Sequence, residues 1–410
     1  MENNKSTADL LIIGGGVFGN SIAFHHCLNY PGRRVVVLER NELNSAATSR
    51  AAAMITKVRA KTQFIPLAKR TYIAIREMEA LLGESLGLRR NGILHVAASE
   101  VKVRELDQLI DIAGQYNESA EYIAAEEAEK MAPWLDCSTV FKIGYMPDEA
   151  YCDPYLLGSF YARSARLLGA EIRTGITAQT IRMKDNRVTG VETDHGYFEA
   201  ENTIVASGAW APMLAKTIGV ELPMAPVRSQ YWITKPDPLF PEASPMVVIP
   251  DVNAYFRPEG GSLLFGIREK KSLGVSPSRL PSELSGFEFS PDRGMRDLTD
   301  AIAGLAAFFP TVYDIGIQHY IAGFSSYTPD NYLSMGKHSQ IEGLMFATGC
   351  VGAGIAVCGG VGHAFSEMAA GKPNPYDFSA FSLDRFGEID STSESWVERC
   401  AAARSVKNSG

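Results

Sequence analysis

The chain has 410 residues and a formal net charge of −8, and 46% of its residues are hydrophobic. At about 150 residues per domain, this length indicates two or three domains, or two that interleave. The apolar fraction excludes wholesale disorder. The negative charge argues against nucleic acid or an anionic lipid surface as a partner, because both need a basic face.

Features that the sequence lacks exclude further classes. No apolar run approaches the ~20 residues of a membrane span, and the N-terminus has no secretory cleavage pattern, so we expect a cytoplasmic protein. The six cysteines form no C-x-x-C pair and are sparse for a disulfide scaffold. We therefore expect reduced thiols and no metal site.

The N-terminal part of the chain predicts a strand, a helix and a second strand. Residues 9–13 form a short apolar run, which is typical of a buried parallel strand. Three glycines follow at once, and residues 20–29 predict a helix. Residues 34–38 predict a valine-rich strand that ends at Glu39. Together these elements predict a βαβ unit.

The glycine spacing in this unit indicates a dinucleotide site. Gly14, Gly16 and Gly19 leave no side chains where a pyrophosphate must approach the backbone. The helix that starts near Val17 directs free N–H groups and the positive end of its dipole at that phosphate. Glu39 lies 20 residues after Gly19, where a carboxylate accepts hydrogen bonds from a ribose hydroxyl.

Later segments predict a second, antiparallel sheet within this fold. Alternating apolar runs at 227–235, 246–251, 254–258 and 263–268 favour antiparallel strands. Residues 321–336 are expected to be irregular and polar, and residues beyond about 385 to form a surface helix with a frayed tail. We expect the dinucleotide fold to comprise residues 1–90, 145–225 and 320–375, the inserted sheet domain 91–144 and 226–319, and a C-terminal extension 376–410.

Four stretches together resemble the D-amino-acid oxidase superfamily, in particular its sarcosine oxidase, glycine oxidase and D-amino-acid dehydrogenase branch. They occur in family order and span roughly residues 8–375. They are Gly14–Glu39; Thr203–Ala211 with Pro226–Tyr231; Tyr255–Gly266; and Gly323–Asp330 with Gly336 and Gly349–Gly362.

The resemblance implies an α/β (α+β) fold, with a Rossmann-like FAD-binding domain of the glutathione-reductase type and an inserted antiparallel-sheet substrate domain. It implies that isoalloxazine lies between residues 48–52 and 350–354, with Ala178 at the adenine. The helix after residue 354 then directs its N-terminus at the negative charge of reduced flavin. The implied FAD-binding residues are Gly14, Gly16, Val17, Phe18, Gly19, Glu39, Arg40, Thr48, Ser49, Arg50, Ala51, Ala178, Ser207, Gly208, Trp210, Gly349, Val351, Gly352, Ala353, Gly354 and Ile355.

The resemblance also implies the reaction. A neutral amine or amino acid on the inserted sheet would pass hydride from its α-carbon to flavin N5, and the imine would then hydrolyse. Such a site needs orientation and desolvation more than a strong base. Dioxygen or an electron carrier would reoxidise the flavin, in a monomer or small homo-oligomer.

The chain departs from the family at the positions that bind FAD covalently. Sarcosine-oxidase-like members have a cysteine before the Tyr-Thr pair, whereas Ser325 and Ser326 precede Tyr327 here. Dimethylglycine-dehydrogenase-like members use a histidine near the first small-residue loop, where this chain has Arg50. We therefore predict non-covalent FAD.

The substrate-binding residues are less well defined. Many relatives have an arginine after Gly323-Phe324 that clamps a substrate carboxylate, but here Ser325 follows. The clamp then comes from Arg50, Arg228 or Arg257, or the substrate lacks a carboxylate. The candidate catalytic residues, each with a purely structural alternative, are Arg50, Tyr255, Arg257, His319 and Tyr327.

Three other functions remain open at this stage. A flavin monooxygenase is disfavoured because the chain contains no Asp-Gly or Gly-Asp pair. An FAD-dependent dehydrogenase of 2-hydroxy acids or alcohols would oxidise a C–OH carbon and ignore amines. A non-enzymatic flavoprotein would bind FAD but resist reduction by any of these substrates.

Overall fold

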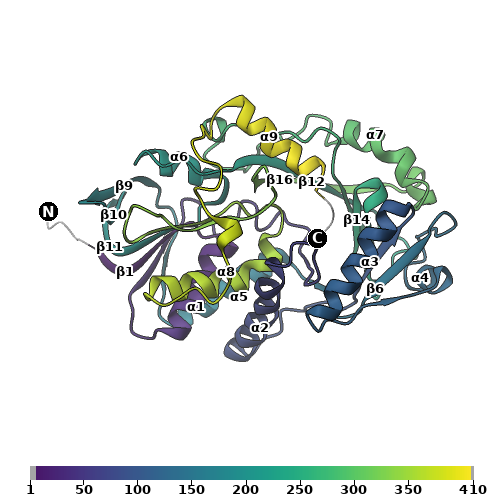
Figure 1. Ribbon diagram of the computed structural model, residues 1–410, viewed down its shortest axis with the longest axis horizontal. Helices are drawn as coiled ribbons and strands as arrows, with labels where there is room; N and C mark the ends of the chain where they lie inside the picture. Colours follow the sequence, from purple (N-terminus) through teal and green to yellow (C-terminus); the bar gives the residue numbers. More distant parts are fainter. Residues whose placement is uncertain (1–5, 408–410) are drawn as a thin grey trace.

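The computed structural model describes residues 6–407, and two large β-sheets organise them. In Figure 1 the first sheet lies on the left with a layer of helices below it, and the second lies on the right among other helices. A two-stranded pair, β3 (Met54–Ile55) and β7 (Ala150–Tyr151), accompanies them. The α/β fold with an antiparallel sheet is confirmed.

The first sheet is parallel at its centre. Its main order is β17-β18-β11-β1-β2-β8, and β9 and β10 extend β11 as an antiparallel hairpin. The pairs β1–β11, β1–β2, β2–β8 and β11–β18 are parallel. The strands are β1 (Ser6–Ile13), β2 (Val35–Leu38), β8 (Glu171–Arg173), β9 (Ala178–Lys184), β10 (Arg187–Thr193), β11 (Gly196–Val205), β17 (Ser334–Lys337) and β18 (Leu344–Thr348).

Four helices cover one face of this sheet (Figure 1). They are α1 (Val17–Asn29), α2 (Phe64–Leu82), α5 (Pro154–Leu167) and α8 (Gly354–Ala369). Glycines allow α8 to pack closely: a Cβ on Gly360 would lie 2.3 Å from the Cα of Leu67 on α2. A Cβ on Gly362 would lie 2.2 Å from Ser21 Oγ on α1. This close packing fixes where α8 begins relative to α1.

The second sheet has the order β16-β12-β15-β14-β13-β4-β6-β5 and is antiparallel except at β13–β4. Its outer helices are α3 (Glu100–Gln115), α4 (Ala125–Met131) and α7 (Met295–Leu305). The strands are β4 (Ile93–Ala97), β5 (Glu121–Tyr122), β6 (Lys142–Met146), β12 (Ala225–Thr234), β13 (Met246–Ile249), β14 (Ala254–Glu259), β15 (Ser262–Ile267) and β16 (Ile317–Tyr327).

The two faces of the second sheet have different neighbours because side chains alternate along each strand. Trp232 and Phe256 belong to a buried aromatic cluster with Trp134 and Phe309. Tyr231, the residue before Trp232, faces the opposite way and lines a cavity. The sheet is therefore a wall with a hydrophobic core on one side and a cavity on the other.

One expectation about the C-terminal half is wrong and another is incomplete. Residues 317–327 form the strand β16, which pairs with β12 along most of its length. The expected helix is α9 (Glu394–Ser405), and it exposes Glu394 and Glu398 on one face. Its other face is packed in the fold, because Trp396 and Cys400 are buried and α9 packs on β12 and β16. Both differences have the same cause, since each segment is stabilised by partners remote in sequence.

The remaining elements are short. The helix α6 (Ala211–Lys216) follows a 3₁₀ turn at Gly208–Trp210. Other 3₁₀ turns are Pro250–Val252, Pro277–Arg279, Pro310–Tyr313 and Ser379–Phe381. Within residues 6–407, no helix is both long and apolar enough to cross a membrane.

Candidate functional site

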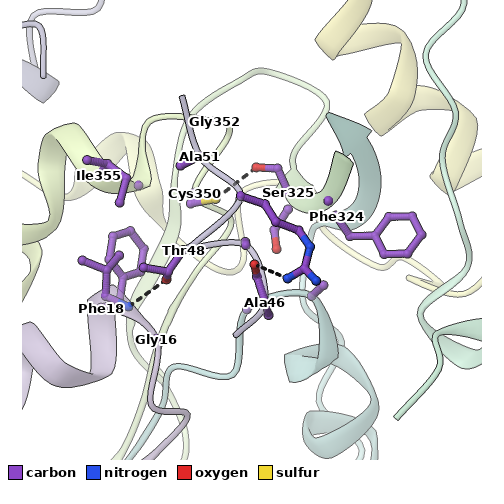
Figure 2. Close-up of a pocket in the computed structure, with 18 of the residues that line it drawn as sticks. Gly16, Phe18, Ala46, Thr48, Ala51, Phe324, Ser325, Cys350, Gly352 and Ile355 are labelled. Carbon is purple, nitrogen blue, oxygen red and sulfur yellow. Dashed lines mark hydrogen bonds between the residues drawn. The ribbon is translucent and has the colours of Figure 1, made fainter. Parts of the chain in front are cut away.

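A cavity of about 500 Å³ lies between the two sheets. Its floor is the carboxyl end of the parallel sheet, where β1, β2, β11 and β18 stop at Ile13, Leu38, Val205 and Thr348. Ligands of open α/β sheets bind at this edge. Its opposite wall is the cavity-facing side of the second sheet. Figure 2 shows the middle of the cavity, where these two parts meet.

The glycine-rich turn after β1 forms a close approach that side chains would block. A Cβ on Gly19 would lie 1.9 Å from the carbonyl oxygen of Gly14, so α1 and β1 touch through this residue. Gly16 is the N-cap of α1 and lines the cavity. Thr48 Oγ1 accepts a hydrogen bond from the N–H of Val17 at 3.0 Å. The next N–H groups in the first turn of α1 have no carbonyl acceptor within the helix, so a ligand can accept from them.

Near the glycine-rich turn, some polar side chains accept hydrogen bonds from backbone N–H groups and others have no partner in the described chain. The Glu39 carboxylate accepts the N–H of Gly15 at 2.7 Å and that of Asn41 at 2.8 Å. The guanidinium of Arg40 stacks over the Trp210 ring at 5.1 Å. Ser207 Oγ is buried without a hydrogen-bond partner in the described chain. These groups leave hydrogen-bonding capacity for a polar ligand.

The small-residue loop after β2 encloses the middle of the cavity. Asn44 and Ala53 have φ of 62° and 57°, so the loop turns sharply at both ends. Arg50 donates to the carbonyls of Ser45 and, at 3.0 Å, of Ala46. Burial lowers the pKa of Arg50 from its usual value. Its carbonyl partners hold the guanidinium within the loop.

A strained loop before α8 faces this small-residue loop across the cavity. Val351 has φ of 45°, which is unusual for a β-branched residue. Its N–H donates to Ser326 at 2.8 Å, and its carbonyl accepts Lys407 Nζ at 2.5 Å. Figure 2 shows Cys350 pointing at Ser325, with 3.2 Å between Sγ and Oγ. A thiol therefore lies inside the cavity.

Two tyrosines and a histidine line the wall formed by the second sheet. Burial raises the pKa of Tyr255 to about 12 and raises that of Tyr231 further, so both remain neutral phenols. The Tyr255 ring covers Gly266, whose Cβ would lie 2.2 Å from it. Burial lowers the pKa of His95 to about 4, and its Nε2 has no partner among the residues described. The wall thus carries neutral hydrogen-bonding groups.

Four cationic side chains gather at the same end of the cavity. Arg404 is paired with Glu269 and donates to Ser272 Oγ at 2.9 Å. The guanidinium of Arg268 has no hydrogen-bond or ion-pair partner within residues 6–407. The other two are Arg59 and Lys407.

Most of the sequence-predicted site residues come together at this cavity. Gly19, Ser49, Gly349, Val351 and Ala353 do not line it themselves but adjoin residues that do. The residues that line it are Gly14, Gly16, Val17, Phe18, Glu39, Arg40, Thr48, Arg50, Ala51, Ala178, Ser207, Gly208, Trp210, Tyr255, Tyr327, Gly352, Gly354 and Ile355.

Three residues considered for substrate binding lie elsewhere. Arg257 is buried below the cavity, where it donates to the Ala52 carbonyl at 2.6 Å and pairs with Glu259. Arg228 is bound to Asp297 at 2.5 Å behind the second sheet. His319 is exposed on β16. None of the three lines the cavity.

Sequence reasoning missed Arg59, His95, Arg268, Arg404 and Lys407. Extending the alternation of β15 by one residue would have pointed to Arg268, because Phe265 and Ile267 face the aromatic core. No local pattern marks the last two residues, since α9 reaches the cavity only through tertiary packing.

Comparison with known proteins gives a consistent result. The model for the FAD dependent oxidoreductases (DAO) matches residues 9–368. The chain is 29% identical to 4-methylaminobutanoate oxidase (formaldehyde-forming) of Paenarthrobacter nicotinovorans, over 92% of this chain and 45% of that protein. It is 26% identical to glycine oxidase of Bacillus licheniformis, over 92% and 97%. Glycine oxidase from Geobacillus kaustophilus has a similar fold, with a TM-score of 0.78, 23% identity and coverage of 94% and 100%.

The match in length differs between these relatives. The chain spans about half the length of several curated relatives that it matches, including human dimethylglycine dehydrogenase, of which it covers 45%. It spans nearly all of the bacterial glycine oxidase.

Proposed function

Because this chain belongs to the family of FAD dependent oxidoreductases, we propose that it oxidises the C–N bond of an amine or amino acid that carries a carboxylate. The observation that carries this proposal is Arg268. Its guanidinium lines the cavity without a protein partner, and burying such a charge is costly unless an anion joins it. Arginine matches a carboxylate with two parallel hydrogen bonds.

The cavity fits FAD at its other end. Gly16 and the start of α1 suit a pyrophosphate, and the partnerless hydroxyl of Ser207 offers a further hydrogen bond. Glu39 has lone pairs left for a ribose after binding two N–H groups. The small-residue loop and the start of α8 leave room for a flat ring between them. We propose that the first sheet holds FAD and the second sheet the substrate.

FAD, when bound, supplies the acceptor for a hydride from the substrate carbon. The residues of this chain orient the substrate for that step. Arg268 anchors the carboxylate, and the phenols of Tyr255 and Tyr231 stay protonated and can donate to it. The aromatic cluster packed behind the second sheet supports this wall, and the wall's side chains are therefore placed to orient the substrate.

A second candidate, oxidation of a 2-hydroxy acid, is favoured by one feature. His95 is neutral and its Nε2 has no partner within the described chain, so it can accept a hydrogen bond from a substrate hydroxyl. A tertiary amine that reacts in its neutral form has no N–H for such an acceptor. A His95→Gln variant would therefore lose hydroxy-acid oxidation and keep amine oxidation.

Anaerobic bleaching of the flavin tests the proposed function. The panel contains glycine, N-methylglycine, N,N-dimethylglycine and 4-methylaminobutanoate, with dimethylamine lacking the carboxylate and lactate replacing the amine. A charge-assisted hydrogen bond contributes about 1.5–3 kcal/mol, so we expect Arg268→Met to lower kcat/KM for carboxylate substrates about 10- to 150-fold. Lys270→Met, which removes an exposed cation two residues away, is the control. Bleaching by none of the amines would refute the proposal.

We also propose that FAD is bound non-covalently. Neither Ser325 nor Arg50 can form the links known in the family, but Cys350 lies in the cavity. Acid precipitation of the purified protein separates the outcomes. Flavin in the supernatant supports the proposal. Flavin that stays in the pellet of the wild type but not of Cys350→Ser would show a link through that thiol.

A further inference from the structure

The charges around the substrate end of the cavity exceed what one carboxylate can balance. Arg59, Arg268, Arg404 and Lys407 all line it. The one aspartate or glutamate that lines the cavity within residues 6–407 is Glu39, at the dinucleotide end. The charged side chains that line the substrate end of the cavity, within the described residues, are therefore all cationic.

Protein partners neutralise just one of these four cations. Arg404 is buried against Glu269 in an ion pair. Arg59 donates through Nε to the neutral carbonyl of Thr56 at 3.0 Å, and its terminal nitrogens have no partner in the described chain. Lys407 donates to the carbonyl of Val351 and has two further N–H groups. With Arg268, three cations form no ion pair within residues 6–407, although Glu149 lies near enough to Arg59, and Glu269 to Arg268, to raise the pKa of each arginine.

Arg59 and Arg268 both lie near Lys407, and all three side chains line the same cavity. Burial lowers the pKa of Lys407 most, and the positive charges of Arg268 and Arg59 lower it further. A partly buried cation cluster of this kind is unfavourable by itself, and an anion placed among the three side chains would relieve it. The carboxylate that Arg268 binds in the proposed function leaves Arg59 and Lys407 for a second anionic group.

Two of the four cations come from outside the part of the chain that matches the family. The match ends at residue 368, whereas Arg404 and Lys407 lie at and beyond the end of α9. Helix α9 crosses β12 and β16 in Figure 1 and brings this segment to the cavity. The second cationic group is therefore a feature of this chain's C-terminal segment combined with Arg59.

We propose that the substrate is an amine with two carboxylates, in which Arg268 binds the first and Arg59 with Lys407 binds the second. This inference rests on the proposed function for the amine. The second carboxylate sets specificity and does not take part in the chemistry. Lys407 is thus a specificity-determining residue supplied by the C-terminal segment.

Binding of unreactive thioethers to the FAD-loaded protein tests the inference without turnover. The matched probes are (methylthio)acetate, thiodiacetate and 3-(carboxymethylthio)propanoate, which differ in the second carboxylate and its spacing. Perturbation of the flavin absorbance gives each Kd. We expect at least one dicarboxylate to bind ten times or more tighter than (methylthio)acetate. Equal affinity for all three would overturn the inference.

Variants assign the preference to its residues. Lys407→Gln keeps an N–H donor for the Val351 carbonyl but removes the charge, and we expect it to abolish the dicarboxylate preference while the Kd of (methylthio)acetate stays within twofold. Lys407→Arg should restore the preference, and Lys270→Met should leave it unchanged. A preference that survives both Lys407→Gln and Arg59→Gln would overturn the assignment. FAD content and thermal midpoint verify that each variant is folded.

Turnover separates this inference from the function on which it rests. N-Methylglycine and iminodiacetate differ by one carboxylate. If both bleach the flavin with equal kcat/KM, amine oxidation stands and the dicarboxylate inference falls. If no amine bleaches it but the thioether preference holds, the anion subsite stands and amine oxidation falls. If Lys407 instead balances the charge of reduced FAD, Lys407→Gln will lower the flavin potential and leave ligand preference unchanged, which also overturns the inference.

Discussion

Substitutions at two nearby glycines should separate FAD binding from folding. Gly16 and Gly19 both belong to the turn between β1 and α1, but an added methyl group meets different neighbours at each. At Gly16 the nearest atom would be Thr48 Oγ1 at 3.3 Å, whereas at Gly19 it would be the Gly14 carbonyl oxygen at 1.9 Å. Gly16 has extended backbone angles, φ −80° and ψ −176°, which alanine also adopts.

The contacts give the size of each effect. Thr48 needs to move by a few tenths of an ångström to accept Gly16→Ala, and glycine and alanine at an N-cap differ by about 1 kcal/mol or less. The methyl group would displace the pyrophosphate from the helix N–H groups. Losing one charge-assisted hydrogen bond there costs about 1.5–3 kcal/mol, so we expect Kd for FAD to rise about 10- to 150-fold.

Gly19→Ala should act on the fold instead. The contact must lengthen by about 1 Å to reach 3.0 Å, which separates α1 from β1, and overpacking of this kind costs about 1–3 kcal/mol or more. Apoprotein of each variant is titrated with FAD by fluorescence quenching, and urea unfolding gives the stability. A Gly16→Ala protein that binds FAD within threefold of wild type would refute the placement of the pyrophosphate at α1.

Further predictions concern the substrate wall. His95 has a pKa of about 4 in the folded protein and about 6.5 in the unfolded chain, so its contribution to folding stability is full above pH 6.5 and declines as the pH falls toward 4. Between pH 7 and pH 5, the free energy of unfolding measured in urea should fall by about 2 kcal/mol more for wild type than for His95→Asn. An equal loss in both proteins would contradict this. A Gly266→Ala methyl would lie 2.2 Å from the Tyr255 ring and push it into the cavity, so the Kd of thioether acids should rise while FAD binding stays unchanged. Unchanged thioether affinity would show that the ring does not border the ligand.

The sequence alone predicts the first βαβ unit well because its determinants are local. The strand β1, the turn glycines and Glu39 follow one another within 35 residues, and each has a specific backbone or charge requirement. Neighbouring elements in such a unit pack on each other, so tertiary context agrees with local pattern. The cavity-lining positions of Gly14 and Gly16 follow from the same logic, whereas Thr48 and Ser207 are expected only from the family resemblance.

The cationic residues are missed for the opposite reason. Arg268 and Lys407 are unremarkable in sequence, and an exposed position is the usual expectation for such side chains. Their burial depends on β14 and β15 forming one wall and on α9 packing over β12. Ser325 and Tyr327 were placed in an irregular segment, because β16 is recognisable as a strand only through its pairing with β12.

Side chains of the second sheet alternate between the aromatic core and the cavity, so point substitutions and one-residue insertions have different consequences there. On β12, β13, β14 and β4, one set of alternate residues packs in the aromatic core and the intervening set faces the cavity. Single substitutions in the cavity-facing set can reshape specificity without touching the packing that keeps the wall in place. Insertion of one residue in any of these strands would exchange the two sets and lose both properties together. The architecture therefore permits new substrates through point mutation while selecting against changes in strand length.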